Sequence, residues 1–247
     1  MYYRFWGLLL VVCFNHVIAA EINSSARIFQ TGFESIDDFA GFYIVPQHHK
    51  GSASHSKSTD KTHSGDYAHK GWIYAKNSPS RFYSNNNHRA YPTIQLYKTP
   101  EGAFKTPVKI EFWVWLDTKI LPGEWFSFAT LDHTRSNKWD AVLVNLSDQG
   151  FVHLMHVPVN GQGKYSFQTS TIQFPMKQWV KLTVALHFDR KEGYAKVWQD
   201  DQLVSSAEVR RGEGVFTQAH FGLYAPPSLS KGVIYNDDLT ITELDTE

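Results

Sequence analysis

The sequence predicts an all-β fold, an antiparallel sandwich or barrel. Short strand-like runs follow one another from residue 89 to residue 244, turn signals such as "LPGE", "SDQG" and "DRKEG" separate them, and no helical period is convincing. Hydrophobic residues make up 42% of the 247 residues and aromatics 15%, which supplies a sizeable core. Because no linker and no internal repeat is visible, we expect one domain over residues 21–247.

The elements are expected in this order. Residues 27–45 mix aromatics with turn residues and should supply the first strands. Residues 46–71 are rich in Ser, His, Lys and Gly and predict a long surface loop, with a short strand near Tyr67 and Ala68. Ten strand-like runs then follow: "RAYPTIQLYK", "VKIEFWVWLD", "EWFSFATLD", "DAVLVNLS", "FVHLMHVPV", "KYSFQTSTIQF", "WVKLTVALHFD", "GYAKVWQDDQLV", "AHFGLYA" and "VIYNDDLTITEL".

The run "KIEFWVWLD" has two unlike faces, because side chains alternate across a strand. Ile110, Phe112, Val114 and Leu116 should face the core, and this leaves Trp113 and Trp115 on the polar face. In "HRAYPTIQLYK" the residues Gln95 and Tyr97 share a face with Arg89.

Rings and planar polar groups on one face suit sugars, whose C–H faces stack on rings and whose hydroxyls need polar partners. We therefore predict a carbohydrate-binding groove with Trp113, Trp115, Gln95 and Tyr97. The alternative is that both tryptophans pack under a loop or against a second layer.

The first twenty residues read as a secretion signal, with one charge at Arg4, an apolar run over residues 5–14, and Ala19 and Ala20 before Glu21. The apolar run is too short for a membrane span. We expect a secreted or periplasmic protein.

Cys13 lies inside this signal, so a mature chain has no cysteine and neither disulfides nor thiolate sites. Without Arg4 there are 23 basic and 24 acidic residues. This balance predicts no nucleic-acid partner.

Asp237 is out of place in "VIYNDDLTITEL", where it shares a face with apolar residues. A carboxylate on a core face must be paired or bound to a cation, and a calcium site built from oxygen ligands is one solution. The alternative is a strand-end Asp that reaches solvent or caps a turn.

Several stretches resemble the concanavalin A-like jelly-roll superfamily of legume lectins, laminin-G-type domains and several polysaccharide lyases. They are "TGFES", "THSGDYAHKG", "QWVKLTVALHF" with "GYAKVWQDDQLV", and the closing "AHFGLYA" and "VIYNDDLTI". The resemblance implies a jelly roll over nearly the whole mature chain. It also implies a structural calcium ion held by Glu34, Ser64, Asp66 and Asp237.

A closer resemblance is to jelly-roll lyases of the alginate and glucuronan type. It places Arg89 of "HRAYPTIQL" on their Arg-x-Glu-Leu strand, His220 and Tyr224 of "HFGLY" on their Lys-x-Gly-x-Tyr strand, and His133 of "ATLDH" on a Gln-x-His strand. This sequence departs from those lyase motifs at three positions. Tyr91 stands in place of the Glu, His220 in place of the Lys, and Leu131 in place of the Gln.

Three functions follow as expectations. The first is a secreted, calcium-stabilised jelly roll that binds a polysaccharide through an aromatic-lined groove. The second is a lyase that cleaves uronate-containing glycans by β-elimination, with Tyr224, His133 or His220 as base and acid and Arg89 neutralising the carboxylate. The third is a non-catalytic adhesion domain of the laminin-G type.

Overall fold

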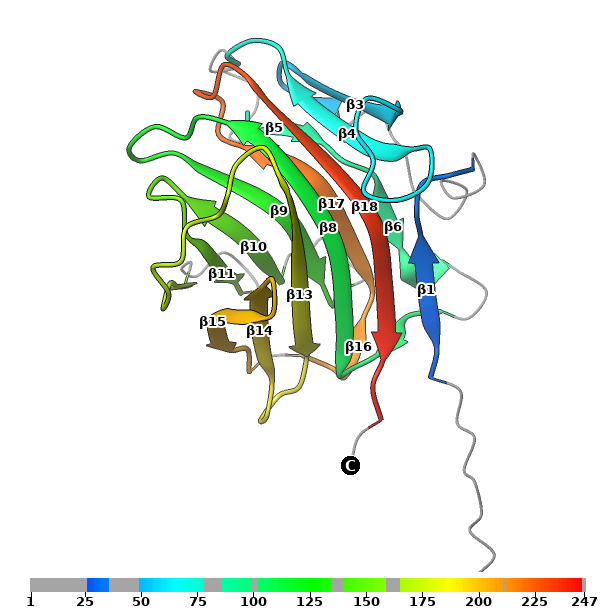
Figure 1. Ribbon diagram of the computed structural model, residues 1–247. Coiled ribbons are helices and arrows are strands. Elements are labelled where there is room, and N and C mark those ends of the chain that lie inside the picture. Colours follow the sequence, from blue (N-terminus) through cyan, green and yellow to red (C-terminus); the bar gives the residue numbers. More distant parts are fainter. Residues whose placement is uncertain are drawn as a thin grey trace, which may run out of the picture.

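The computed structural model describes residues 26–35, 49–77, 86–98, 102–134, 140–158, 165–210 and 212–245. Two antiparallel sheets lie face to face, with β13, β8 and β18 of one sheet crossing in front of β9, β10 and β17 of the other (Figure 1). The predicted signal at residues 1–20, and residues 36–45 of the predicted first-strand segment, lie outside the described residues.

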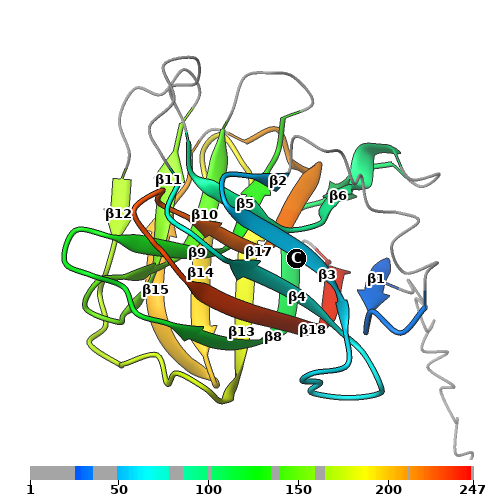
Figure 2. The same cartoon turned by 90° about the horizontal axis from the view of Figure 1, so that it is seen from above.

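Sheet A has eight strands, and Figure 2 shows β3, β4, β18 and β8 side by side. Its order is β15 (Gln202–Glu208), β14 (Tyr194–Gln199), β13 (Trp179–His187), β8 (Val108–Thr118), β18 (Gly232–Glu243), β4 (Ala68–Ile73) and β3 (Ala53–Ser58), and β1 (Ile28–Thr31) also pairs with β18.

Sheet B also has eight strands. Its order is β12 (Tyr165–Phe167), β11 (Val152–Val157), β10 (Ala141–Ser147), β9 (Trp125–Asp132), β17 (Gln218–Ala225), β5 (His88–Ala90) and β2 (His49–Lys50), and β6 (Thr93–Gln95) also pairs with β17. The 3-10 helix η3 (Leu96–Lys98) follows β6, and β7 (Phe104–Lys105) pairs with β16 (Val215–Phe216) apart from both sheets.

The core lies between the two sheets, because each long strand turns every second side chain inward. In β8 the predicted core residues Ile110, Phe112, Val114 and Leu116 are all buried, which confirms that prediction. From here on, the outer face of a sheet means the face turned away from the other sheet. Within the described ranges, no helix is long and apolar enough to cross a membrane.

The predicted loop at residues 46–71 needs correction, because it contains β2, β3 and the start of β4. The expected short strand near Tyr67 and Ala68 is β4, which begins at Ala68. Strand β3 is polar because it lies at the edge of sheet A, where backbone pairing with β4 holds it and only Ala53 of its side chains is buried. A Ser- and His-rich composition therefore does not exclude an edge strand.

Candidate functional site

Five side chains form a row across the outer face of sheet B, one from each of five neighbouring strands. Their neighbours Leu223, Val144 and Leu154 face the core, so alternation turns the row outward. We call it the cross-strand row, and the strand registers place its members opposite one another: Arg89 on β5, Tyr224 on β17, Ser127 on β9, Asn145 on β10 and His153 on β11.

Tyr224 stands in an aromatic and cationic setting. The Trp125 ring lies edge-on at 5.0 Å between centroids, and the Arg89 guanidinium carbon lies 5.5 Å from the Tyr224 ring centroid. The side-chain amide of Asn87 donates to the Tyr224 hydroxyl at 2.8 Å. Because Trp125, Arg89 and Tyr224 are all partly exposed, this group is open to a ligand.

His220 lies on the same face but in a separate group. Its Nδ1 is 2.7 Å from the Thr93 hydroxyl, and the Tyr91 ring lies 4.6 Å away between centroids. Tyr91 also contacts Tyr224 at 6.5 Å, so its ring stands between the two. Burial raises the pKa of Tyr91, which keeps this ring neutral.

A third group lies farther along the same strands, where Gln95, Gln218 and Asp132 are opposite one another. Asp132 accepts hydrogen bonds from the backbone N–H and the hydroxyl of Thr134 at 2.8 and 2.9 Å. Burial nevertheless raises the pKa of Asp132 to about 6. The side-chain carbonyls of Gln95 and Gln218 and the carboxyl group of Asp132 are further acceptors for the hydroxyl groups of a ligand.

His133 does not join this face, which corrects its placement beside the predicted lyase residues. Leu131 is fully buried in the core, and Thr130 and Asp132 are the outward residues of β9. His133 instead packs on Phe188 at 4.8 Å. Its Nε2 lies 3.5 Å from Asp140, whose carboxylate is also 3.0 Å from His156. The cause is a register shift between β9 and β10, which a count along the sequence does not reveal.

Trp113 and Trp115 lie on the outer face of sheet A, whereas Gln95 belongs to β6 of sheet B and Tyr97 to η3, which follows β6. The His63 ring stacks on Trp113 at 3.8 Å and 15°. Lys61 lies 4.5 Å from the Trp115 ring centroid, and Tyr235 contacts that ring edge-on. The four predicted carbohydrate residues therefore do not form one groove, and both tryptophans pack against the segment that joins β3 to β4.

The predicted calcium residues do lie together. Glu34 accepts the backbone N–H of Asp66 at 3.0 Å, and Asp237 accepts those of His63 and Ser64 at 2.8 and 3.2 Å. Asp237 is fully buried, and burial raises its pKa to about 6. These carboxylate oxygens are occupied by N–H donors, and the described residues contain no group of three or more His, Cys, Asp and Glu that could hold a metal ion. Calcium therefore stays a prediction.

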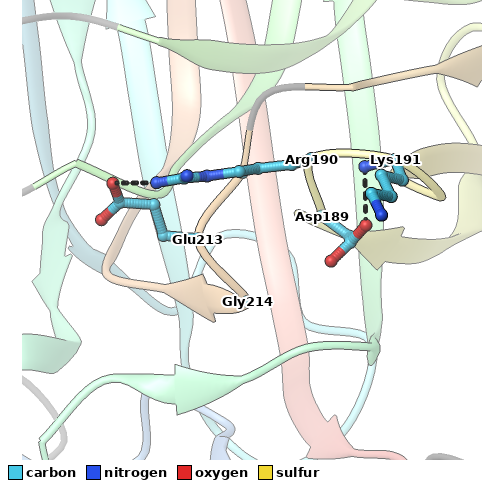
Figure 3. A pocket seen from close by; sticks show the side chains of 6 residues that line it. Asp189, Arg190, Lys191, Glu213 and Gly214 are labelled. Carbon is cyan, nitrogen blue, oxygen red and sulfur yellow. Dashed lines mark hydrogen bonds and ion pairs between the residues drawn. The ribbon is translucent and has the colours of Figure 1, made fainter.

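An open depression of about 520 Å³ lies where the turn between β13 and β14 meets the segment before β16 (Figure 3). It is lined by Asp189, Arg190, Lys191, Gly212, Glu213 and Gly214. Arg190 pairs with Glu213 at 3.4 Å, and Asp189 accepts the backbone N–H of Lys191. The depression is open, its ion pair is largely exposed and none of its lining residues is aromatic, so we assign it no function.

The sequence pattern contained the signal for most of the residues that prediction missed. Alternation in "EWFSFATLD" places Trp125 and Ser127 opposite the core residues Phe126 and Phe128, and the same pattern turns Asn145 and His153 outward. What alternation cannot supply is the order of the strands, so it could not show that these side chains meet in one row.

Two stacked antiparallel sheets with this strand order define a β-sandwich of the jelly-roll class. The fold is the concanavalin A-like jelly roll, as predicted. No protein-family model and no curated protein matches the chain.

Three solved structures illustrate the likeness in fold. The cellulose-induced protein Cip1 is 14% identical, with a TM-score of 0.61 over 89% of this chain and 100% of that one. The family 7 alginate lyase A1-II′ is 12% identical, with a TM-score of 0.52 over 76% of this chain and 84% of that one. A doubly substituted variant of A1-II′ in complex with its substrate GGMG is also 12% identical, with a TM-score of 0.52 over 77% and 83%.

Proposed function

We propose that the protein is secreted and binds an acidic polysaccharide on the outer face of sheet B. The observation that carries the proposal is the cross-strand row, with Trp125 beside Tyr224 and Arg89 at one end. Partly exposed rings stack on the C–H faces of sugars, and a guanidinium binds a carboxylate through paired hydrogen bonds. Sheet B offers all of these groups within one contiguous face.

The names of the structural neighbours agree with this ligand class. A1-II′ is named as an alginate lyase and was solved with an oligosaccharide substrate, and Cip1 is named as a cellulose-induced protein. With identities of 14% or less, these neighbours support the fold, and the ligand class rests on the residues of this chain.

The binding test compares two substitutions on sheet B with one on sheet A. We expect the wild-type protein to bind at least one of alginate, glucuronan, glucuronoxylan or hyaluronan in affinity electrophoresis. The bound polysaccharide slows the migration of the protein in the gel. Trp125→Ala and Arg89→Ala should abolish this slowing, and Trp113→Ala should keep it. If Trp113→Ala abolishes the slowing and Trp125→Ala keeps it, the binding site lies on sheet A.

A second candidate function on the same face is β-elimination, favoured by the position of Arg89 next to Tyr224. In that reaction the phenol oxygen of Tyr224, as the phenolate, would accept the proton α to the uronic carboxylate, and Arg89 would stabilise the enolate. The electron pair would then form a ring double bond as the C4–O bond breaks, and the leaving oxygen would take up a proton. His220 and His133 are not beside Tyr224, so Tyr224 is the acid–base residue in this proposal.

The elimination test follows the ultraviolet absorbance of the new double bond, with the same four polysaccharides. Tyr224→Phe should abolish the rise in absorbance and keep binding, because the ring remains. If the wild-type protein gives no rise with any polymer that it binds, the protein binds these polymers without cleaving them by elimination.

A further inference from the structure

We infer that His88 is a positioning residue for the proposed polysaccharide site: from inside the sandwich it holds Arg89 in place beside Tyr224 and does not touch the ligand itself. This role depends on the proposed polysaccharide binding. His88 directly precedes Arg89 on β5, and alternation turns the two side chains to opposite faces of sheet B. His88 faces inward and is fully buried, whereas Arg89 is partly exposed beside the Tyr224 ring.

The strand that carries Arg89 is short. Strand β5 has three residues, all of which pair with β17, and only Arg89 and Ala90 pair with β2. Because so few backbone bonds hold this strand, its place depends on contacts made by its side chains. A guanidinium that is already in place when the ligand arrives loses less conformational entropy on binding. A residue that fixes β5 therefore raises the affinity for an acidic ligand.

His88 supplies such a contact. Its Nε2 lies 3.0 Å from the carbonyl oxygen of Leu229, in the turn that follows β17. A carbonyl only accepts, so Nε2 carries the proton. Burial lowers the pKa of His88, against the smaller opposing effect of the carbonyls of Leu229 and Pro227, so the ring is neutral at neutral pH. This bond ties β5 to the end of the strand that carries Tyr224.

The surroundings of His88 hold it in this position. The backbone N–H of Asn77 donates to Pro227 in the same turn at 2.8 Å, and the Asn77 side-chain amide donates to the carbonyl oxygen of Asn86 at 2.6 Å. Gly51 closes one side, with a φ of +76°. A Cβ at this position would lie 2.8 Å from Nδ1 of His88 and 3.3 Å from its Cα. A larger residue at position 51 would therefore displace His88.

The experiment measures calorimetric affinity for tetrasaccharides of alginate, glucuronan, glucuronoxylan and hyaluronan, the four polymers of the binding test. His88→Leu removes the donor to Leu229 and should weaken binding about fivefold, the equivalent of one hydrogen bond. His88→Gln should bind as wild type does, because the glutamine amide can donate to the Leu229 carbonyl in place of the imidazole. A melting curve checks that each variant is folded.

Gly51→Ala is the second variant, and it keeps the His88 side chain. Gly102→Ala is its matched control, because Gly102 has a φ of +77° and a Cβ there would meet no atom of the described chain within 4 Å. Both substitutions strain the backbone alike, and only the first displaces His88. We expect Gly51→Ala to weaken binding about fivefold, as His88→Leu does, and Gly102→Ala to keep the wild-type affinity.

Carboxyl-reduced tetrasaccharides test whether His88 acts through Arg89. They lack the acidic group that the guanidinium is proposed to bind, so the wild-type protein, His88→Leu and Gly51→Ala should bind them equally. An equal loss of affinity for acidic and reduced probes would mean general damage to the fold, and it would reject the positioning role.

The positioning role is also rejected if folded His88→Leu keeps the wild-type affinity for the acidic probes, or if Gly51→Ala binds them as tightly as Gly102→Ala. If His88→Leu does not fold, Gly51→Ala and its control decide. Binding that still depends on Arg89 would in these cases leave the proposed function standing. A wild-type protein that binds none of the four acidic probes would reject both.

Discussion

At the scale of single residues, hydrogen-bond direction indicates what the site offers a ligand. Asn87 donates its amide to the Tyr224 hydroxyl, so the phenol oxygen is the acceptor in this contact. Arg89 has donors only, whereas Asn145 has an acceptor that pairs with none of the described residues. The partly exposed end of the row therefore offers the donors of Arg89, which suit an acidic group of a ligand.

Asp132 gives a prediction at this scale. Burial raises its folded pKa from 3.8 to about 6, so its protonated form favours folding below pH 4 and this contribution is lost as the pH rises through 6. Asp132→Asn keeps the oxygen that accepts from Thr134 and cannot ionise. Its free energy of unfolding should rise relative to wild type between pH 4 and 7, by up to about 3 kcal/mol at about 1.4 kcal/mol per pH unit.

Urea denaturation at several pH values checks this. Asp201→Asn, at an exposed turn position, is the control and should show no such trend. A constant difference between Asp132→Asn and wild type across the range would contradict a raised pKa for Asp132.

At the scale of elements, sequence predicts a strand better than it predicts what covers the strand. Alternation in β8 identified Ile110 and its inward neighbours correctly, because burial of one face is encoded locally. The stacking of His63 on Trp113 could not be predicted, because His63 lies in a turn some fifty residues away in the sequence. The inward position of His133 could not be predicted either, because it depends on a register shift between β9 and β10. Edge strand β3 was missed because its pairing uses the backbone, not its side chains.

Trp113→Ala tests the packing of the segment that joins β3 to β4. Because the Trp113 ring stacks with His63 and is partly buried, its loss should lower the free energy of unfolding by roughly 2 kcal/mol. Urea denaturation measures this. Unchanged stability together with lost polysaccharide binding would instead make Trp113 a ligand residue.

The predicted calcium residues Glu34 and Asp237 contact the same segment at Gly65 and Ser64. If an ion joins these residues, chelation should lower the melting temperature, and Asp237→Asn should abolish that sensitivity. An unchanged melting temperature on chelation would mean that the N–H bonds to Glu34 and Asp237 hold the segment without a metal.

At the scale of the whole molecule, the two outer faces have different roles in our account. Sheet A carries a tryptophan-rich face that packs against its own chain near His63, and sheet B carries the cross-strand row. Both faces have aromatic and polar side chains, so composition alone does not separate them. The separation comes from the sandwich, which places strands distant in sequence on one sheet.

Nuclear magnetic resonance of the tryptophan indole N–H groups tests this division most directly. Titration with an acidic polysaccharide fragment should shift the Trp125 resonance, and the Trp113 and Trp115 resonances should stay in place. Shifts of Trp113 and Trp115 with an unmoved Trp125 would contradict the assignment of the binding face to sheet B.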